Sequence, residues 1–251
     1  AFATGAVTVD LAAGTTSGAE GSDTLSGIPN ALGSGFDDSL LGDSAANALT
    51  GGAGRDTLSG GTENDTLLGG SGDDSVVGGD GANDWASYAP SGQPVTIDLA
   101  AGTTFGDAGF DTLSGIENIL GGASSDIIFG DGQANILDGS TGNNTLSGAA
   151  GNDTLIGNAG VDSITGGNGD DSIFGSTGVD WASYGAASGA VTVDLAATVP
   201  NAAGADGNDT LSGVENIRGG NFADSILGDS LANSLDGGAG DDTLLGGFGN
   251  D

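Results

Sequence analysis

The chain has 251 residues, among them 53 glycines, and its 35 acidic side chains against two basic ones give a net charge of −33. The absence of His and Cys excludes a Ser–His–Asp triad, a Cys–His pair, an ordinary zinc site and disulfide bonds. Because positive charge is nearly absent and no apolar run approaches the ~20 residues of a membrane span, we expect neither nucleic-acid binding nor membrane insertion.

The first predicted element is a strand at Val7–Leu11, and its sequence returns almost unchanged at 95–99 and 191–195. A following segment at 23–27, Asp-Thr-Leu-Ser-Gly, returns in the same order behind each copy. These recurring segments predict one continuous solenoid over 1–251 that consists of three longer repeats. The predicted repeats are 1–88, 89–184 and an incomplete third at 185–251.

Behind each such strand the chain follows a nine-residue period. Every frame begins with Gly, and position eight is apolar in each complete frame, as in Leu40, Leu58 and, in the frame from Gly78, Trp85. An acidic disordered linker has no reason to keep such a period, so the pattern indicates a folded chain despite the composition. The frames begin at Gly33, Gly42, Gly51, Gly60, Gly69, Gly78, Gly121, Gly130, Gly139, Gly148, Gly157, Gly166, Gly175, Gly219, Gly228, Gly237 and Gly246.

Position six of most frames holds an acid, which makes it the candidate metal ligand of the repeat. Asn takes this position in some frames, and one inserted residue in the frame from Gly78 leaves Asp84 one place later. The predicted metal-binding residues are Asp38, Asp56, Asp65, Asp74, Asp84, Asp126, Asp153, Asp162, Asp171, Asp180, Asp224, Asp242 and Asp251.

The residues of one frame predict its local structure. Gly at positions one, two and four permits positive φ angles and a tight loop. Positions seven to nine form a short strand in which position eight points inward and positions seven and nine point outward. Two frames form one coil of about 18 residues, and stacked coils form two parallel sheets around a thin core. We therefore predict an all-β fold, a parallel β-roll or β-solenoid.

Segments such as Gly51–Ser59 (GGAGRDTLS) and Gly166–Phe174 (GGNGDDSIF) resemble the nonapeptide GGxGxDxUx of RTX (repeats-in-toxin) proteins. The three runs that carry the resemblance make up well over half of the chain, and the tandem recurrence makes the motif specific. The resemblance implies a parallel β-roll with calcium ions between stacked Gly/Asp loops. It also implies a bacterial protein exported unfolded by type I secretion and found outside the cell or at its surface.

The residues themselves also favour calcium. Each coil buries two inward side chains, too few to offset the chain entropy and the repulsion among the acids. Neighbouring carboxylates beside loop carbonyls form an all-oxygen pocket that suits Ca²⁺ better than Mg²⁺, so we expect multiple Ca²⁺ ions. The alternative is that each Asp only caps its turn through a hydrogen bond. The predicted neighbours along one edge are Asp56–Asp74, Asp65–Asp84, Asp153–Asp171 and Asp162–Asp180.

The frames at the start of each run depart from the pattern, and we expect fewer or weaker calcium sites there. Position four is not Gly, and the second frame of each run has Asn at position six and Asp at position two. The position-four residues are Phe36, Ala45, Gln133, Phe222 and Leu231, and the position-two acids are Asp43, Asp131 and Asp229.

Aromatic residues and then a connecting stretch follow the first two runs. We expect the aromatic residues to close the end of each run, with a carbohydrate platform as the alternative. Prolines in the connecting stretches predict irregular turns or wider coils and not separate domains. The aromatic residues are Trp85, Tyr88, Trp181 and Tyr184.

Two classes of function fit these observations. The first is an extracellular calcium-binding structural or interaction protein, such as a segment of a surface layer, a matrix fibre or a large adhesin. The alternative is an accessory RTX folding or secretion module of a secreted enzyme or toxin. We expect no enzyme activity, because the paired carboxylates are better explained as cation ligands than as an acid–base pair.

Self-association is the expected partner interaction, with cell-surface polysaccharide as a second candidate partner. Position nine should face outward and is nevertheless apolar in many frames, which predicts end-to-end or lateral association into a filament. The last frame stops at Asp251, before its strand, so we expect the array to continue. The apolar position-nine residues are Leu41, Leu68, Val77, Phe129, Ile156, Phe174, Leu227 and Leu245.

Overall fold

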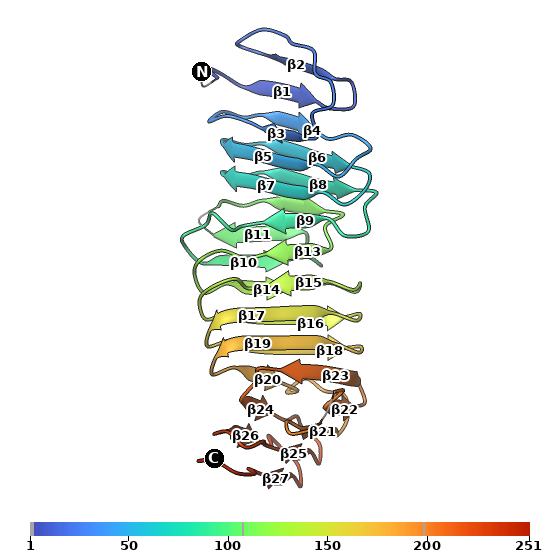
Figure 1. The fold of residues 1–251 in the computed structure, drawn as a ribbon, viewed down its shortest axis with the longest axis vertical. Helices are drawn as coiled ribbons and strands as arrows, with labels where there is room; N and C mark the ends of the chain where they lie inside the picture. Colours follow the sequence, from blue (N-terminus) through green and yellow to red (C-terminus); the bar gives the residue numbers. More distant parts are fainter. Residues whose placement is uncertain (1–2, 107, 198) are drawn as a thin grey trace. The chain divides into compact units, whose positions relative to one another are not determined.

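The computed structural model describes residues 3–106, 108–197 and 199–251, and regular structure in these ranges is entirely β (Figure 1). The chain divides into two compact units, Ala1–Ala123 and Ser124–Asp251. Within the described ranges, no helix is long and apolar enough to cross a membrane. Each unit is built from stacked coils with parallel strands, which confirms the predicted all-β roll.

The described residues of the first unit form thirteen strands in two sheets. They are β1 (Val7–Asp10), β2 (Thr15–Gly18), β3 (Asn30–Leu32), β4 (Ser39–Leu41), β5 (Ala48–Ala53), β6 (Thr57–Gly61), β7 (Thr66–Ser71), β8 (Ser75–Gly79), β9 (Trp85–Ser87), β10 (Val95–Asp98), β11 (Thr103–Gly106), β12 (Thr112–Ser114) and β13 (Asn118–Leu120). The strand orders are β2-β1-β4-β6-β8-β12-β11-β10 and β13-β9-β7-β5-β3. Successive nonapeptide strands therefore alternate between the two sheets.

The second unit repeats this arrangement with fourteen strands. They are β14 (Ile127–Phe129), β15 (Ile136–Asp138), β16 (Thr145–Ala150), β17 (Thr154–Gly160), β18 (Ser163–Asn168), β19 (Ser172–Gly178), β20 (Trp181–Ser183), β21 (Val191–Asp194), β22 (Ala202–Gly204), β23 (Gly207–Ser212), β24 (Asn216–Arg218), β25 (Ser225–Leu227), β26 (Ser234–Asp236) and β27 (Thr243–Leu245). The strand orders are β14-β16-β18-β20-β24-β26 and β27-β25-β21-β22-β23-β19-β17-β15.

Position eight forms the core of each roll, as predicted, except in the last coil of the second unit, where Leu244 is 43% exposed. Leu49 of β5 lies beside Leu67 of β7, so residues two frames apart stack and a coil has the expected length. Both side chains are at most 1% exposed. The assignment of Trp85 to position eight was wrong, because the residue inserted in its frame shifts the strand by one place. Ala86 pairs with Leu67 and is buried, while Trp85 is half-buried.

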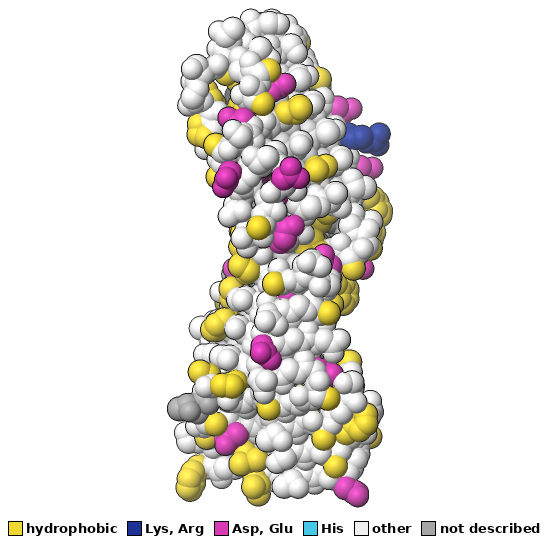
Figure 2. Space-filling model, turned by 90° about the vertical axis from the view of Figure 1, so that its right-hand side faces the viewer, with side chains coloured by type: hydrophobic (Ala, Val, Ile, Leu, Met, Phe, Trp, Pro, Cys, Tyr) yellow, Lys and Arg dark blue, Asp and Glu magenta, His cyan; other side chains and the backbone are white. Residues whose placement is uncertain are grey.

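Position-nine side chains face outward, which also agrees with the sequence. Phe129 and Phe174 are 40% and 37% exposed. These residues do not form continuous ridges: Phe129 has Ser147 as its neighbour on the next strand, whereas Phe174 lies beside Ile156. On the face shown in Figure 2, hydrophobic side chains are correspondingly spread among polar ones.

The connecting stretches contain antiparallel hairpins, so the expectation of irregular turns was wrong, whereas that of wider coils is confirmed, because Asp74 and Asp111 of neighbouring coils are 37 residues apart. Strand β10 pairs with β11 from Val95 opposite Gly106 to Asp98 opposite Thr103, and β21 pairs with β22 in the same way. The alternation of buried Val95 and Ile97 with outward residues is typical of a strand with one buried face. Each hairpin is built into a roll sheet: β11 also pairs with β12, and β21 and β22 also pair with β25 and β23.

Candidate metal sites

The position-six side chains of stacked loops form a ladder along each edge of a roll. The backbone N–H of Asp56 donates to Asp74 Oδ1 at 2.8 Å, and that of Asp153 donates to Asp171 Oδ1 at 2.9 Å. The other two predicted pairs share this bond: Asp65–Asp84 at 2.7 Å and Asp162–Asp180 at 2.8 Å. All four predicted neighbours are confirmed, because strands that alternate between sheets bring every second loop back to the same edge.

The second carboxylate oxygen of these residues, Oδ2, is buried and has no hydrogen-bond partner. A buried carboxylate oxygen without a partner is costly, so each one marks a place for a positively charged partner. No three acidic side chains of the described residues form a group that could hold a metal ion unaided. A ligand set must therefore include main-chain carbonyls. The eight unpartnered oxygens belong to Asp56, Asp65, Asp74, Asp84, Asp153, Asp162, Asp171 and Asp180.

The glycine at position one keeps the space in front of each unpartnered oxygen open. A β-carbon on Gly51 would collide with Asp56 Oδ2 and with the carbonyl oxygen of Gly69 in the next coil. Gly148 has the same relation to Asp153 and to the next coil. A carboxylate oxygen and a carbonyl oxygen thus face the same small space. This all-oxygen arrangement fits Ca²⁺, which takes six to eight oxygen ligands, and the Asp and Gly residues of stacked loops would hold it.

One loop has Asn in place of the acid, and it shows which kind of partner the neighbouring carbonyl oxygens need. In the frame from Gly139, position six is Asn144, and its Nδ2 donates to the carbonyl oxygens of Gly142 at 3.2 Å and Gly157 at 3.4 Å. Gly142 belongs to the same loop, and Gly157 begins the loop of the next coil. The amide N–H group supplies the positive partner that the carbonyls need. A carboxylate in the same position cannot supply it and needs a cation instead.

Burial raises the pKa of several ladder carboxyl groups in the absence of a cation. It raises the pKa of Asp74 and of Asp153 to about 7, and that of Asp171 to about 6. The negative charge of a neighbouring carboxylate adds to this increase in pKa, whereas the bond from the backbone N–H opposes it. These carboxyl groups are therefore poorly stabilised as anions until a positive partner is present.

The loops adopt two conformations. In open loops, which we define as those of the eight unpartnered oxygens, the position-two residue has a positive φ, as in Gly52 at 122° and even Asn158 at 69°. In closed loops the position-two N–H instead donates to the side-chain oxygen of position six. The closed loops begin at Gly33, Gly42, Gly130, Gly219 and Gly228.

Two predicted ligands, Asp38 and Asp224, lie in closed loops. Asp38 Oδ1 accepts the N–H of Val7 at 2.7 Å, and its Oδ2 accepts the N–H of Ser34. Asp224 accepts two backbone N–H groups in the same way, at 2.9 and 2.7 Å. Phe36 occupies position four of the Asp38 loop, where open loops commonly use a glycine with positive φ. Turn capping therefore accounts for these two acids, which supports the expectation of weaker sites there.

The remaining predicted ligands are placed as follows. Asp242 Oδ1 and Asp251 Oδ1 each accept a backbone N–H from the preceding coil, at 2.9 and 3.0 Å. Asp242 is half-buried and Asp251 is exposed. Asp126 is buried, and its own N–H donates to Asn144 Oδ1 at 2.9 Å.

Four acids outside the nonapeptides extend the ladders, and the sequence prediction missed them. Each accepts the N–H of the last nonapeptide Asp of one ladder, although it belongs to a connecting stretch. Their common segment, DTLSG followed by Ile or Val and then Glu-Asn, does recur at 111–118 and 209–216, but it lies outside the nine-residue period. The bonds are Asp74 to Asp111 at 3.0 Å, Asp84 to Glu117 at 2.9 Å, Asp171 to Asp209 at 3.0 Å and Asp180 to Glu215 at 2.8 Å.

The tyrosines after the first two runs complete two of these ladders. The hydroxyl group of Tyr88 donates to Asp111 Oδ2 at 3.0 Å, and Thr104 Oγ1 donates to the same oxygen at 3.0 Å. Tyr184 donates to Asp209 Oδ2 at 2.9 Å. Burial raises the pKa of both tyrosines well above 10, so they remain hydrogen-bond donors at neutral pH. The tyrosines thus close the runs, as expected, by hydrogen bonding and not by packing alone.

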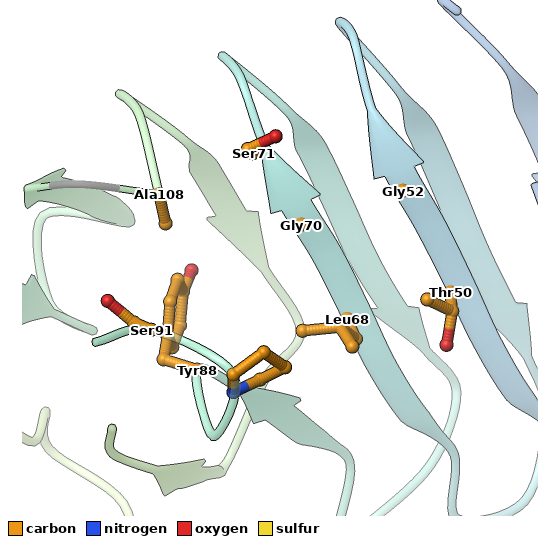
Figure 3. A pocket seen from close by; sticks show the side chains of 9 residues that line it. Thr50, Gly52, Leu68, Gly70, Ser71, Tyr88, Ser91 and Ala108 are labelled. Atoms are coloured by element: carbon orange, nitrogen blue, oxygen red, sulfur yellow. The ribbon is translucent and has the colours of Figure 1, made fainter. Parts of the chain in front are cut away.

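A shallow groove of about 360 Å³ lies on the first unit, beside β5, β7 and the turn after β9 (Figure 3). Thr50, Leu68, Tyr88 and Ser91 line it, and none of its described lining residues is a carboxylate. The corresponding hollow of the second unit, about 190 Å³, has Asp206 as the one carboxylate among its described lining residues. Neither lining brings an acid and a base together. Among the described residues, the buried carboxylate oxygens that lack a hydrogen-bond partner therefore lie at the loop edges and not in these hollows.

A β-roll whose loop edges carry buried carboxylates beside main-chain carbonyls has the fold and the sites of a calcium-binding repeat protein. The family model of the RTX calcium-binding nonapeptide repeat (4 copies) matches residues 32–67, 50–84, 111–146, 147–182 and 218–251. The chain belongs to this family, and it binds multiple Ca²⁺ ions. RTX proteins are typically secreted by bacteria. None of the curated proteins compared with the chain matches it.

Replacing Asp171 with Ala is expected to weaken calcium binding far more than replacing Asp206. Asp171 is buried in a ladder and has an unpartnered oxygen, whereas Asp206 is half-buried on a connecting stretch and its carboxylate is already satisfied by hydrogen bonds from Ser188. Asp171→Ala should lower the free energy of unfolding of the calcium-loaded protein by about 3 kcal/mol, and Asp206→Ala by at most about 0.5 kcal/mol. Thermal melts at fixed free calcium measure both. Equal shifts for the two variants would contradict the assignment of Asp171.

Low pH is expected to stabilise the fold of the metal-free protein in part, as calcium does. Because the folded pKa values of Asp74 and Asp153, about 7, exceed the ordinary value near 4, the folded metal-free chain binds more protons than the unfolded chain. Its free energy of unfolding therefore falls as pH rises from about 4 to about 7, and protons compete with calcium over the same range. Metal-free protein should gain β-structure by circular dichroism between pH 8 and pH 5.5. High salt at pH 8 is the control, because it screens charge without protonating the buried groups; an equal gain there would contradict the prediction.

Proposed function

We propose that this protein is an extracellular calcium-binding structural protein of a bacterium, a segment of a surface layer, matrix fibre or large adhesin without catalytic activity of its own. The observation that carries the proposal is the outward position of apolar side chains along the calcium-binding coils. Phe129 and Phe174 are 40% and 37% exposed, and Ile156 lies beside Phe174 on the neighbouring strand. Exposed apolar side chains on rigid, repeated elements are typical of surfaces that bind other proteins.

Calcium would control this association through charge. The chain alone carries a net charge of −33, and like charges keep such chains apart. Each bound Ca²⁺ neutralises two negative charges. It also orders the strands that present the apolar side chains. We therefore propose that the calcium-loaded form associates with further copies of itself, laterally through the outer faces of its sheets.

Light scattering and electron microscopy of the protein with calcium and with EGTA test the proposal. Calcium should raise the molar mass above that of one chain and produce ordered assemblies. The double variant Ile156→Ser/Phe174→Ser should lower the assembled fraction at least several-fold while leaving the calcium-loaded β spectrum unchanged. Phe110→Ser is the matched control, because Phe110 is 62% exposed but belongs to a connecting stretch and not to position nine.

The other outcomes are equally informative. A calcium-loaded protein that stays monomeric at high concentration contradicts the proposal and favours the accessory RTX module of a secreted enzyme or toxin. Filaments that survive the double variant and grow by end contacts would favour end-to-end assembly. Binding of cell-surface polysaccharide, the second proposed partner, is measured in parallel on the calcium-loaded protein, with the groove of Figure 3 as the surface to test.

A further inference from the structure

The last open loop of each long run is not followed by another nonapeptide loop on the same edge of the roll. These are the loops that begin at Gly78 and Gly175, and they contain Asp84 and Asp180. In the loops from Gly51, Gly60 and Gly148, the next coil supplies a carboxylate from position six and a carbonyl from position one. Here the chain leaves the repeat and enters a connecting stretch, so the missing half of the site must come from residues that do not follow the nonapeptide pattern.

The connecting stretch supplies the carboxylate. The N–H of Asp84 donates to Glu117 Oε2 at 2.9 Å, and the N–H of Asp180 donates to Glu215 Oε2 at 2.8 Å. Inside a run, the same donor is bound by an Asp Oδ1, as in the 2.7 Å bond from Asp65 to Asp84. The glutamates therefore occupy the place of the position-six acid of a following coil.

The same stretch supplies the carbonyl. A β-carbon on Gly78 would collide with the carbonyl oxygen of Gly115, just as one on Gly51 would collide with that of Gly69. In the second unit the carbonyl oxygen of Gly213 has this position in front of Gly175. Both stretches are held there by main-chain bonds, because the backbone oxygens of Asp84 and Asp180 accept N–H groups from them. A Gly-x-Glu segment thus reproduces with two-residue spacing what a nonapeptide provides with five-residue spacing.

The site contains an oxygen that no other group satisfies. Asp84 Oδ2 and Asp180 Oδ2 are buried without a partner, and both side chains are 0% exposed. On the opposite edge the capping acids are satisfied, since the second oxygens of Asp111 and Asp209 accept tyrosine hydroxyl groups. The Oδ2 atoms of Asp74 and Asp171 on that edge are nevertheless buried without a partner, so both edges of each run lack a positive partner.

We propose that Glu117 and Glu215 are calcium ligands that complete the last site of each long run together with Asp84 and Asp180. Each of these two ions joins a nonapeptide loop to a connecting stretch and so orders that stretch on calcium binding. The proposal does not depend on the assembly role, because it concerns calcium binding by a single chain.

The test uses the full chain with Glu117→Gln, Glu215→Gln and the double variant. Gln keeps the length and an acceptor for the Asp N–H but removes the charge. Glu20→Gln is the matched control, since Glu20 is exposed, lies outside the runs and loses the same charge. Equilibrium dialysis at the calcium concentration that just saturates the unchanged protein should show one Ca²⁺ fewer for each single variant and two fewer for the double variant. The control should lose none.

A second measurement uses Tb³⁺ in place of calcium. The two tryptophans of the chain, Trp85 and Trp181, directly follow Asp84 and Asp180, so they should sensitise Tb³⁺ emission from these sites. Each single variant should lose a large part of that emission from one unit while the other unit serves as an internal reference for folding. Calcium stoichiometry and Tb³⁺ emission equal to those of Glu20→Gln would overturn the proposal.

Discussion

Excess EGTA is expected to abolish most of the β-structure of this protein, and calcium is expected to restore it cooperatively. The described residues of each unit include four buried carboxylate oxygens without a partner. An unsatisfied buried polar group costs about 1–3 kcal/mol, so four cost about 4–12 kcal/mol, as much as the whole stability of many domains. The core is one row of position-eight side chains per sheet and cannot offset this cost. Binding free energy is therefore folding free energy in these rolls.

Circular dichroism in EGTA, followed by a calcium titration, measures this expectation. Mg²⁺ at the same concentrations is the control and should restore much less structure, because Mg²⁺ dehydrates reluctantly and requires strict octahedral geometry. A full β spectrum in excess EGTA, after metal analysis has shown the protein to be calcium-free, would contradict the prediction. The same behaviour in a cell would keep the chain unfolded at low cytosolic calcium and fold it outside, which is the basis for the proposed export of an unfolded chain.

Gly166→Ala is expected to destabilise the second roll by blocking a cation site and not by straining the backbone. Gly166 has no positive φ, so the backbone conformation itself would accept alanine. The new β-carbon would, however, collide with Oδ2 of Asp171 and fill the space that the cation needs. We expect the loss of a calcium ion and a decrease in the free energy of unfolding of at least ~2 kcal/mol.

Gly132→Ala is the control within the same unit. Gly132 lies in a closed loop, has no positive φ, and a β-carbon there would meet nothing within 4 Å. This variant should change the free energy of unfolding by at most about 0.5 kcal/mol and bind as much calcium as the unchanged protein. Thermal melts and calcium stoichiometry of the two variants separate a blocked metal site from a general effect of replacing glycine. Equal stability of the two would show that the space in front of Asp171 is not a cation site.

The period of the sequence determined the fold and most of the ladder. A nine-residue repeat with an apolar position eight leaves one way to bury those residues, so the stacking of Leu49 on Leu67 follows from spacing alone. The neighbours Asp56 and Asp74 follow from the same spacing, two frames apart. The expectation of weak sites where position four is not Gly also came from the sequence, because backbone conformation at that position depends on the residue itself.

The tertiary structure decided what happens where the period ends. Asp111 and Glu117 reach the ladder across separations of 37 and 33 residues, and a hairpin of unpredicted geometry determines which of their oxygens arrives there. The direction in which the loop N–H groups point could not be predicted from the sequence either. In closed loops the position-two N–H satisfies the acid, and in open loops it does not. That choice depends on contacts with the next coil as well as on the residues of the loop, and it decides which carboxylates still need a cation.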